Sequence, residues 1–163
     1  MFKENIQIIQ INKTDIPYDL LLLSDDTTEG IDKNFDGGEL FVAKIEGKAV
    51  AAFILKLVEP DTIEIKNIAV SENYQGKGIG TLLLDFIISK ACDENLRNLI
   101  VGTCDLCLKE IEFYKKSDFK ITGVKTNYFI DYYKKPINEN GEQIKDMVML
   151  SIDLKEYTKH NDH

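Results

Sequence analysis

Three glycines lie between an apolar segment and a leucine-rich segment in residues 67–84, which read NIAVSENYQGKGIGTLLL. Gly76, Gly78 and Gly80 are separated by single residues. Glycine has no Cβ, so a glycine-rich backbone can turn with positive φ and approach a ligand closely. Where such a loop precedes a helix, the unpaired amides of the first helical turn can bind an anion. The segment therefore predicts a strand, a phosphate-binding loop and a helix, in that order.

Two common phosphate-binding loops do not fit this spacing. A Walker loop needs Gly, four residues and then Gly-Lys-Ser/Thr, which the segment around Lys77 does not supply. A dinucleotide fingerprint is G-x-G-x-x-G after the first strand of a fold, whereas these glycines are spaced G-x-G-x-G and follow several strand-like segments. A third pattern, Q-x-x-G-x-G, is satisfied by Gln75, Gly78 and Gly80.

The order of the expected elements indicates a mixed-sheet α/β or α+β domain. Strands are expected at residues 5–11, 39–45, 48–58, 62–70, 99–103, 119–124 and 146–154. Helices are expected at residues 14–23, capped by Thr14, and at 30–35, 78–95 and 108–116. Turn residues at 46–47 and 60–61 favour an antiparallel meander, and Asn140-Gly141 favours a late hairpin.

The segment 62–70 contains a change of phase. Ile63 and Ile65 fall on odd positions, whereas Ile68 and Val70 fall on even ones. A β-bulge at residues 66–67 would produce this slip. A strand buried on both faces is the alternative, because parity then carries little information. A bulge would leave backbone groups unpaired beside the glycine loop.

In these segments the chain resembles the GNAT superfamily of N-acetyltransferases, whose motif Q/R-x-x-G-x-G/A lies between a bulged strand and a long helix. The resemblance also covers LIVGT, IEFYKKSDFK and the ending PINENGEQIKDMVMLSIDL, which is similar to a bacterial branch of poorly assigned substrate. It implies a mostly antiparallel central sheet of about six to seven strands, flanked by helices, with the bulged strand at the cofactor site.

The resemblance implies acetyl-CoA as co-substrate and no metal. A helix start offers amides and a positive dipole end to the pyrophosphate. The expected pyrophosphate-binding residues are Gln75, Gly76, Lys77, Gly78, Ile79, Gly80 and Thr81. The backbone of Ile68, Ala69 and Val70 is expected to hold the pantetheine arm and the acetyl group. A tight glycine turn without a ligand is the alternative.

Two residues lie where the family places proton-transfer groups. Tyr114 matches the usual general acid, and a phenol with a pKa of about 10 suits a thiol of about 8.5; simple packing beside the cofactor is the alternative. Glu64 lies where several members place a general base. Direct transfer from an ammonium to a carboxylate is uphill by roughly 8 kcal/mol. Glu64 is therefore expected to act through water, with altered proton affinity, or by attracting the cation, unless it is only a solvated carboxylate.

Residues 24–39 contain six acids and one base. Such a stretch is either a solvated loop or a wall that attracts a cation. The family often builds its acceptor site there, so Asp25, Asp26 and Glu29 are candidate substrate-binding residues. The sequence thus favours an N-acetyltransferase for a primary amine, with a polyamine or aminoglycoside-like cation preferred. A protein or peptide amine, or a non-catalytic acyl-CoA-binding sensor, are the alternatives.

Two positions depart from the family pattern. Asp105 stands where an Asn often contacts the cofactor, and a carboxylate there would weaken the binding of a polyanion unless it faces away. Asp118 replaces the Gly before the Phe of the F-Y motif. If that position requires positive φ, Asp is among the few side chains that tolerate it.

Length and composition set the remaining expectations. A chain of 163 residues fits one acetyltransferase domain over residues 1–155, with a polar tail at 156–163. A net charge of −8 disfavours nucleic acid as a partner. Without a secretory signal or a long apolar segment, the chain is expected to be cytoplasmic and to have no membrane partner. It is expected to be a monomer or a homodimer.

Three cysteines form no regular disulfide framework. Cys104 and Cys107 make a C-x-x-C, which is expected to reflect chance proximity rather than a redox or metal site. The two histidines, His160 and His163, lie in the polar tail.

Overall fold

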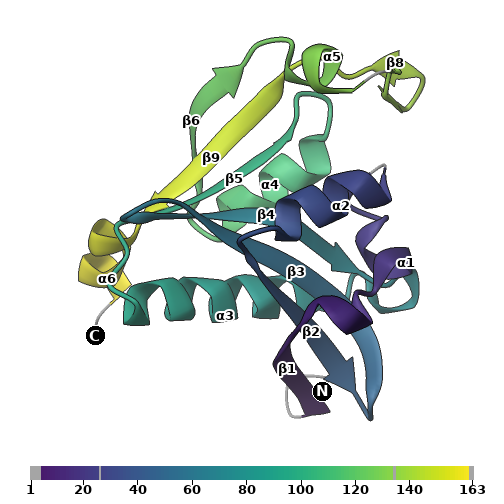
Figure 1. Cartoon of the computed structure of the whole chain (residues 1–163). Coiled ribbons are helices and arrows are strands. Elements are labelled where there is room, and N and C mark those ends of the chain that lie inside the picture. The colour runs from purple at the N-terminus through teal and green to yellow at the C-terminus, as the bar shows by residue number, and fades with distance from the viewer. Residues whose placement is uncertain (1–4, 26, 134, 162–163) are drawn as a thin grey trace. The chain divides into compact units, whose positions relative to one another are not determined.

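The computed structural model describes residues 5–25, 27–133 and 135–161 (Figure 1). The chain divides into two compact units, Met1–Leu96 and Arg97–His163. Among the described residues, four main strands belong to the first unit and three to the second. Helices accompany the strands in both units, and the described strand pairs are antiparallel. The mixed, mostly antiparallel α/β fold expected from the sequence is confirmed.

The first unit contains an antiparallel meander. Its strands pair in the order β1-β2-β3-β4. Their bounds are Ile6–Ile11 for β1, Glu39–Ile45 for β2, Lys48–Glu59 for β3 and Thr62–Val70 for β4. Glu46 and Gly47 join β2 to β3 with positive φ at both residues, as a two-residue hairpin requires. The predicted meander is confirmed.

Helices pack on both faces of this meander (Figure 1). They are α1 (Tyr18–Leu21), α2 (Thr28–Phe35) and α3 (Ile79–Asp93). On one face, α1 and α2 contribute to a buried cluster made of Leu21, Ile31, Phe35, Leu40, Val42, Ala52 and Ile54. On the other face, Phe86 of α3 packs on the rings of Phe41 and Phe53, with centroids 5.8 and 5.9 Å away. Successive side chains of β2 and β3 thus pack alternately on the two faces of the sheet.

The predicted Thr14-capped helix is wrong in detail. Asn12 caps a short 3-10 turn, η2 (Lys13–Asp15), because its side-chain oxygen accepts a hydrogen bond from the Thr14 amide. The α-helical part begins only at Tyr18, after Pro17. The two-step start arises because Asn12 caps better than Thr14 and because proline restricts the residue before it.

The second unit pairs its main strands in the order β5-β9-β6. They are β5 (Asn98–Cys104), β6 (Lys120–Lys125) and β9 (Met147–Asp153), with helices α4 (Leu108–Lys116), α5 (Tyr128–Tyr132) and α6 (Leu154–Asn161). The hairpin of β7 (Asn138–Glu139) and β8 (Glu142–Gln143) turns at Asn140-Gly141, as predicted. The sequence did not predict α5, and α6 covers much of the expected polar tail.

Cys104 and Cys107 form a disulfide, so the expectation of chance proximity is wrong. Cys104 ends β5 and Cys107 precedes α4. A tight turn brings them together, with the Cys107 amide donating to the Cys104 carbonyl at 3.1 Å.

Asp118 stands where the family usually has a glycine, and its φ is 72°. The position therefore does have the positive φ that the usual glycine suggested.

The described residues contain no helix long and apolar enough to span a bilayer. They also contain no group of three or more His, Cys, Asp or Glu side chains that could hold a metal ion.

Candidate functional site

Strand β4 carries a bulge at Lys66. Ile65 lies opposite Leu55 and Asn67 lies opposite Ile54, so Lys66 is an extra residue in the ladder. Beyond the bulge, Ile68 lies opposite Phe53, which belongs to the same face as Leu55. The change of phase in the sequence is therefore a bulge, and it places apolar side chains from both halves of the strand on the face that α3 covers.

The glycine loop follows β4 directly. It contains the short 3-10 turn η3 (Glu72–Tyr74) and reaches α3 at Ile79. Gly76 and Gly78 have φ of 73° and 85°, and no described atom lies within 4 Å of where a Cβ would stand on either. Both positions therefore require glycine for backbone conformation rather than for lack of space. The space in front of the loop is open to a ligand.

The start of α3 presents unpaired amides. Gly78 is its N-cap and has no capping side chain, and the first intrahelical bond runs from the Leu82 amide to the Gly78 carbonyl at 3.1 Å. The amides of Ile79, Gly80 and Thr81 therefore have no acceptor within the helix. Ile79 is 2% exposed, which fixes this turn to the core. The geometry fits a pyrophosphate, because the donors and the positive end of a 15-residue helix converge on one place.

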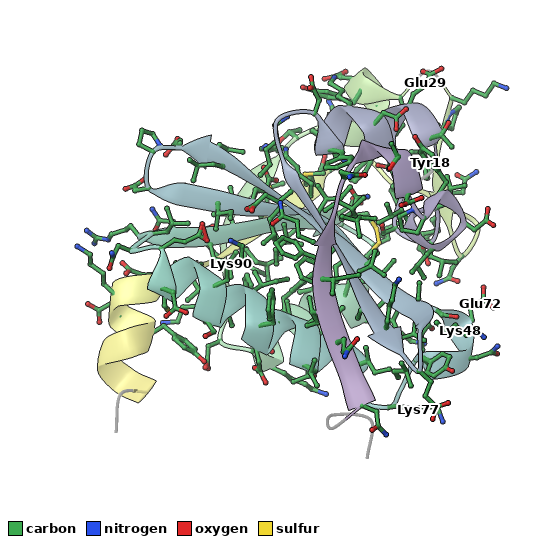
Figure 2. The ribbon with its side chains drawn as sticks, turned by 60° about the horizontal axis from the view of Figure 1, so that its bottom comes forward. Tyr18, Glu29, Lys48, Glu72, Lys77 and Lys90 are labelled. Atoms are coloured by element: carbon green, nitrogen blue, oxygen red, sulfur yellow. A yellow bond between two sulfur atoms is a disulfide. The ribbon has the colours of Figure 1, made fainter. Side chains whose placement is uncertain are left out.

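Side chains tie the loop to the strands and supply charge around it. The Gln75 amide group donates to the Val70 carbonyl at 2.9 Å, which holds the loop against the end of β4. Lys48, at the start of β3, lies with its Nζ 5.9 Å from the centre of the Tyr74 ring. Figure 2 shows Lys48 and Lys77 toward the same end of the first unit. Sequence reasoning missed Lys48, because its proximity depends on strand pairing.

Glu64 is a buried carboxylate, so the alternative of a merely solvated side chain does not hold. The residue is 8% exposed, and its Oε1 lies 2.9 Å from Nζ of Lys66 in the bulge. Its register partner is Lys56. Two cations therefore flank Glu64 along β3 and β4, and the bulge residue itself holds one of its oxygens.

The acidic residues of the α1–α2 connection differ in their surroundings. Asp25 accepts hydrogen bonds from the Thr27 amide at 3.3 Å and from Nδ2 of Asn34 at 3.4 Å. Glu29 is exposed in the first turn of α2 (Figure 2). Asp26 lies outside the described residues. One candidate carboxylate is thus held by the protein and another faces solvent.

Two tyrosines have raised pKa values. The hydroxyl of Tyr18 donates to Asp32, and this hydrogen bond raises the pKa of Tyr18. In the second unit, Tyr114 is 5% exposed and packs against Phe113 and Phe119. Burial, with a smaller contribution from the Glu110 carboxylate, raises the pKa of Tyr114. The Tyr114 phenol therefore stays protonated well above neutral pH.

Asp105, which replaces the usual family Asn, has a local structural partner. Its Oδ1 accepts a hydrogen bond from the Lys145 amide at 3.3 Å, and the Asp105 amide donates to the Asp146 carbonyl at 3.0 Å. The carboxylate thus supports the segment that leads into β9.

A bulged strand, a glycine loop with positive φ and an uncapped helix start define a transferase that takes its acyl group from a coenzyme A thioester. Residues 7–119 match the family model "Acetyltransferase (GNAT) family", and the chain belongs to this family. It is an acetyl-CoA-dependent N-acetyltransferase.

Similar proteins cover nearly the whole chain. A GNAT family acetyltransferase from Elizabethkingia anophelis, solved with acetyl-CoA bound, is 40% identical with a TM-score of 0.89, over 93% of this chain and 99% of that one. An IAA acetyltransferase from Bacillus cereus is 36% identical with a TM-score of 0.85, over 91% and 99%. The uncharacterized N-acetyltransferase YvbK of Bacillus subtilis is 35% identical over 84% of this chain and 88% of its own length.

Proposed function

We propose that the chain acetylates a primary amine on a cationic small molecule, such as a polyamine or an aminoglycoside. The observation that carries this proposal is the direct contact between the acidic connection and the bulged strand. Asn34 of α2 donates to both Asp25 and Asn67, at 3.4 and 2.8 Å. Because Asn67 immediately follows the bulge in β4, the contact joins carboxylates that attract a cation to the expected acetyl-binding strand.

The co-substrate is proposed to bind along β4 and the glycine loop. The amides of residues 79–81 and the charge of Lys77 would hold the pyrophosphate, and the backbone of Ile68, Ala69 and Val70 would hold the pantetheine arm and acetyl group. Acetyl-CoA supplies an acetyl group activated as a thioester. The glycines at 76 and 78 support this assignment, because the open space in front of them admits a ligand to the backbone.

Proton handling is assigned to Glu64 and Tyr114. Glu64 would accept the amine proton through a water molecule or hold the cationic acceptor. Its ion pair with Lys66 keeps the carboxylate fixed at the bulge. Tyr114 would donate a hydrogen bond to the leaving thiolate. Its raised pKa favours hydrogen-bond donation over complete proton transfer.

Replacing Tyr114 with Phe tests this role. Tyr114→Phe should lower kcat about tenfold or more, while the affinity for acetyl-CoA changes little. Full turnover in this variant would contradict the role.

The experiment is acetyl-CoA-dependent release of free thiol across a panel of acceptors. The panel contains polyamines, aminoglycosides, amino acids, basic peptides and IAA, the compound named for the Bacillus cereus relative. Release above the no-acceptor rate with the polycations, together with acetylated product by mass spectrometry, is the expected result. Activity confined to peptides or IAA would overturn the acceptor assignment. Acetyl-CoA binding without turnover on any acceptor would favour a sensor.

A further inference from the structure

Asn67 is a buried polar residue that the family motif does not explain. It is 3% exposed and immediately follows the bulge residue of β4. Its register partner Ile54 belongs to the buried cluster that includes Leu21 and Ile31. The Asn67 side chain therefore lies on the face that α1 and α2 cover, and not on the face of α3.

Both ends of the Asn67 amide are used. Its Oδ1 accepts from Nδ2 of Asn34 at 2.8 Å, and its Nδ2 donates to the Ser24 hydroxyl at 3.1 Å. Asn34 also donates to Asp25 at 3.4 Å, and Ser24 donates to the Leu21 carbonyl at 2.9 Å. One side chain of β4 thus holds two points on the α1–α2 segment.

The network lies where apolar packing ends. Leu21 and Ile31 are fully buried and hold α1 and α2 on the sheet. Ser24 and Asp25 begin the polar connection between the two helices, where side-chain hydrogen bonds replace apolar contacts. An apolar side chain at position 67 would remove the hydrogen bonds to Asn34 and Ser24, which would keep only their bonds to Asp25 and to the Leu21 carbonyl. The connection would then lose the hydrogen bonds that set its distance from β4.

We propose that Asn67 is a positioning residue that sets the distance between the acidic α1–α2 connection and the bulge of β4, and so fixes where the acceptor amine lies. This inference rests on the proposed function, in which the connection binds a cationic acceptor and the residues after Asn67 hold the acetyl group. The carboxylate of Asp25 and the thioester site would then be coupled through two side chains, those of Asn34 and Asn67.

The test compares Asn67→Leu with Thr62→Val. Thr62 is a buried polar residue of the same strand, 5% exposed, whose hydroxyl bonds locally to Asp61 at 3.0 Å. Asn67→Leu should raise the acceptor KM at least tenfold and raise the ratio of acetyl-CoA hydrolysed to amine acetylated, with the acetyl-CoA KM within about twofold. Thr62→Val should lower the melting temperature and leave these kinetic values unchanged. Equal kinetic effects of the two variants would overturn the inference.

A milder variant and a double variant keep the test decisive if Asn67→Leu does not fold. Ser24→Ala, at an exposed position, removes one of the two contacts and should raise the acceptor KM about threefold. Adding Asn34→Ala to Ser24→Ala should have a more than additive effect, because both contacts act through Asn67. Unchanged acceptor KM in both would overturn the inference. Failure of the proposed function is distinct, since the unaltered protein would then acetylate no cationic amine.

Discussion

Two regions adjoin strand β4, and the forces that shape them differ. The glycine loop takes its form from its own backbone, since Gly76 and Gly78 adopt positive φ with no described atom near a Cβ position. The α1–α2 connection takes its form from side chains, since Ser24 and Asn34 are held by Asn67 of β4. The loop is therefore a local structure, and the connection depends on a contact with a distant strand.

We propose that this difference matches the two substrates of the enzyme. A loop that binds through backbone amides suits the part of acetyl-CoA that is constant, because those donors do not change when side chains change. A connection built from side-chain hydrogen bonds can be altered by single substitutions, which suits a region that selects the acceptor. Substitutions in the loop should act on acetyl-CoA, and substitutions in the connection should act on the amine.

The largest effect is expected for Gly78→Val. A β-branched side chain at a φ of 85° costs about 1–2 kcal/mol or more, and relieving the strain would rotate the amides at the start of α3. The KM for acetyl-CoA should rise about 30-fold or more while the acceptor KM stays within twofold. Steady-state kinetics with each substrate varied in turn measures both values.

Gly47→Val is the matched control for this substitution. Gly47 has a φ of 79° and no described atom within 4 Å of its Cβ position, but it lies in the β2–β3 turn. It should lose similar stability on thermal unfolding and keep its acetyl-CoA KM. If the two variants bind acetyl-CoA equally well, the loop is not the pyrophosphate site.

An intermediate effect is expected for Glu64→Gln on β4. The change removes the charge but keeps the shape. Because Glu64 is expected to act through water, kcat should fall about tenfold, which is less than the roughly 100-fold or more of a general base in direct contact. The acidic limb of the pH–rate profile should flatten, and the acetyl-CoA KM should stay constant. Glu59→Gln, which removes an exposed carboxylate from β3, serves as the control. A pH profile that is unchanged in Glu64→Gln would remove Glu64 from proton transfer.

The same difference between local structure and contacts of distant segments explains which features the sequence predicts. The strand, glycine loop and helix were predicted because local residues encode positive φ, helix start and apolar period. The bulge is also visible in the local sequence, because the apolar positions change from odd to even numbers between Ile65 and Ile68. In contrast, Asn67 meets Asn34 across 33 residues, and its register depends on strand pairing. No spacing in the sequence indicates such a contact.

Two other errors come from contacts that are short in sequence but depend on turn and cap geometry. The sequence predicts that the Thr14 hydroxyl caps a helix, but this hydroxyl and the Thr14 amide both donate to Oδ1 of Asn12, two residues earlier. The Cys104–Cys107 disulfide depends on the turn between β5 and α4, which C-x-x-C spacing alone does not specify. Lys48 approaches Tyr74 only because β3 and β4 pair. Local patterns therefore predict most elements, whereas caps, turns and strand pairing decide which side chains meet.

The smallest effect is expected for Gly30→Ala in the first turn of α2. A Cβ on Gly30 would lie 2.7 Å from Oδ1 of Asp25 and 3.0 Å from the Thr27 hydroxyl oxygen, so the Asp25 carboxylate must move. The helix itself should gain up to about 1 kcal/mol, because alanine is the better helix former. The acceptor KM should therefore rise about threefold without loss of melting temperature, a combination that unfolding cannot produce.

Thr28→Ala is the control for this last prediction, because it also improves helix propensity at an exposed position of α2. It should leave the acceptor KM unchanged. If Gly30→Ala also leaves the acceptor KM unchanged, the position of Asp25 does not matter to the amine. The acidic α1–α2 connection would then be a solvated segment, and only the glycine loop would retain a proposed role in substrate binding.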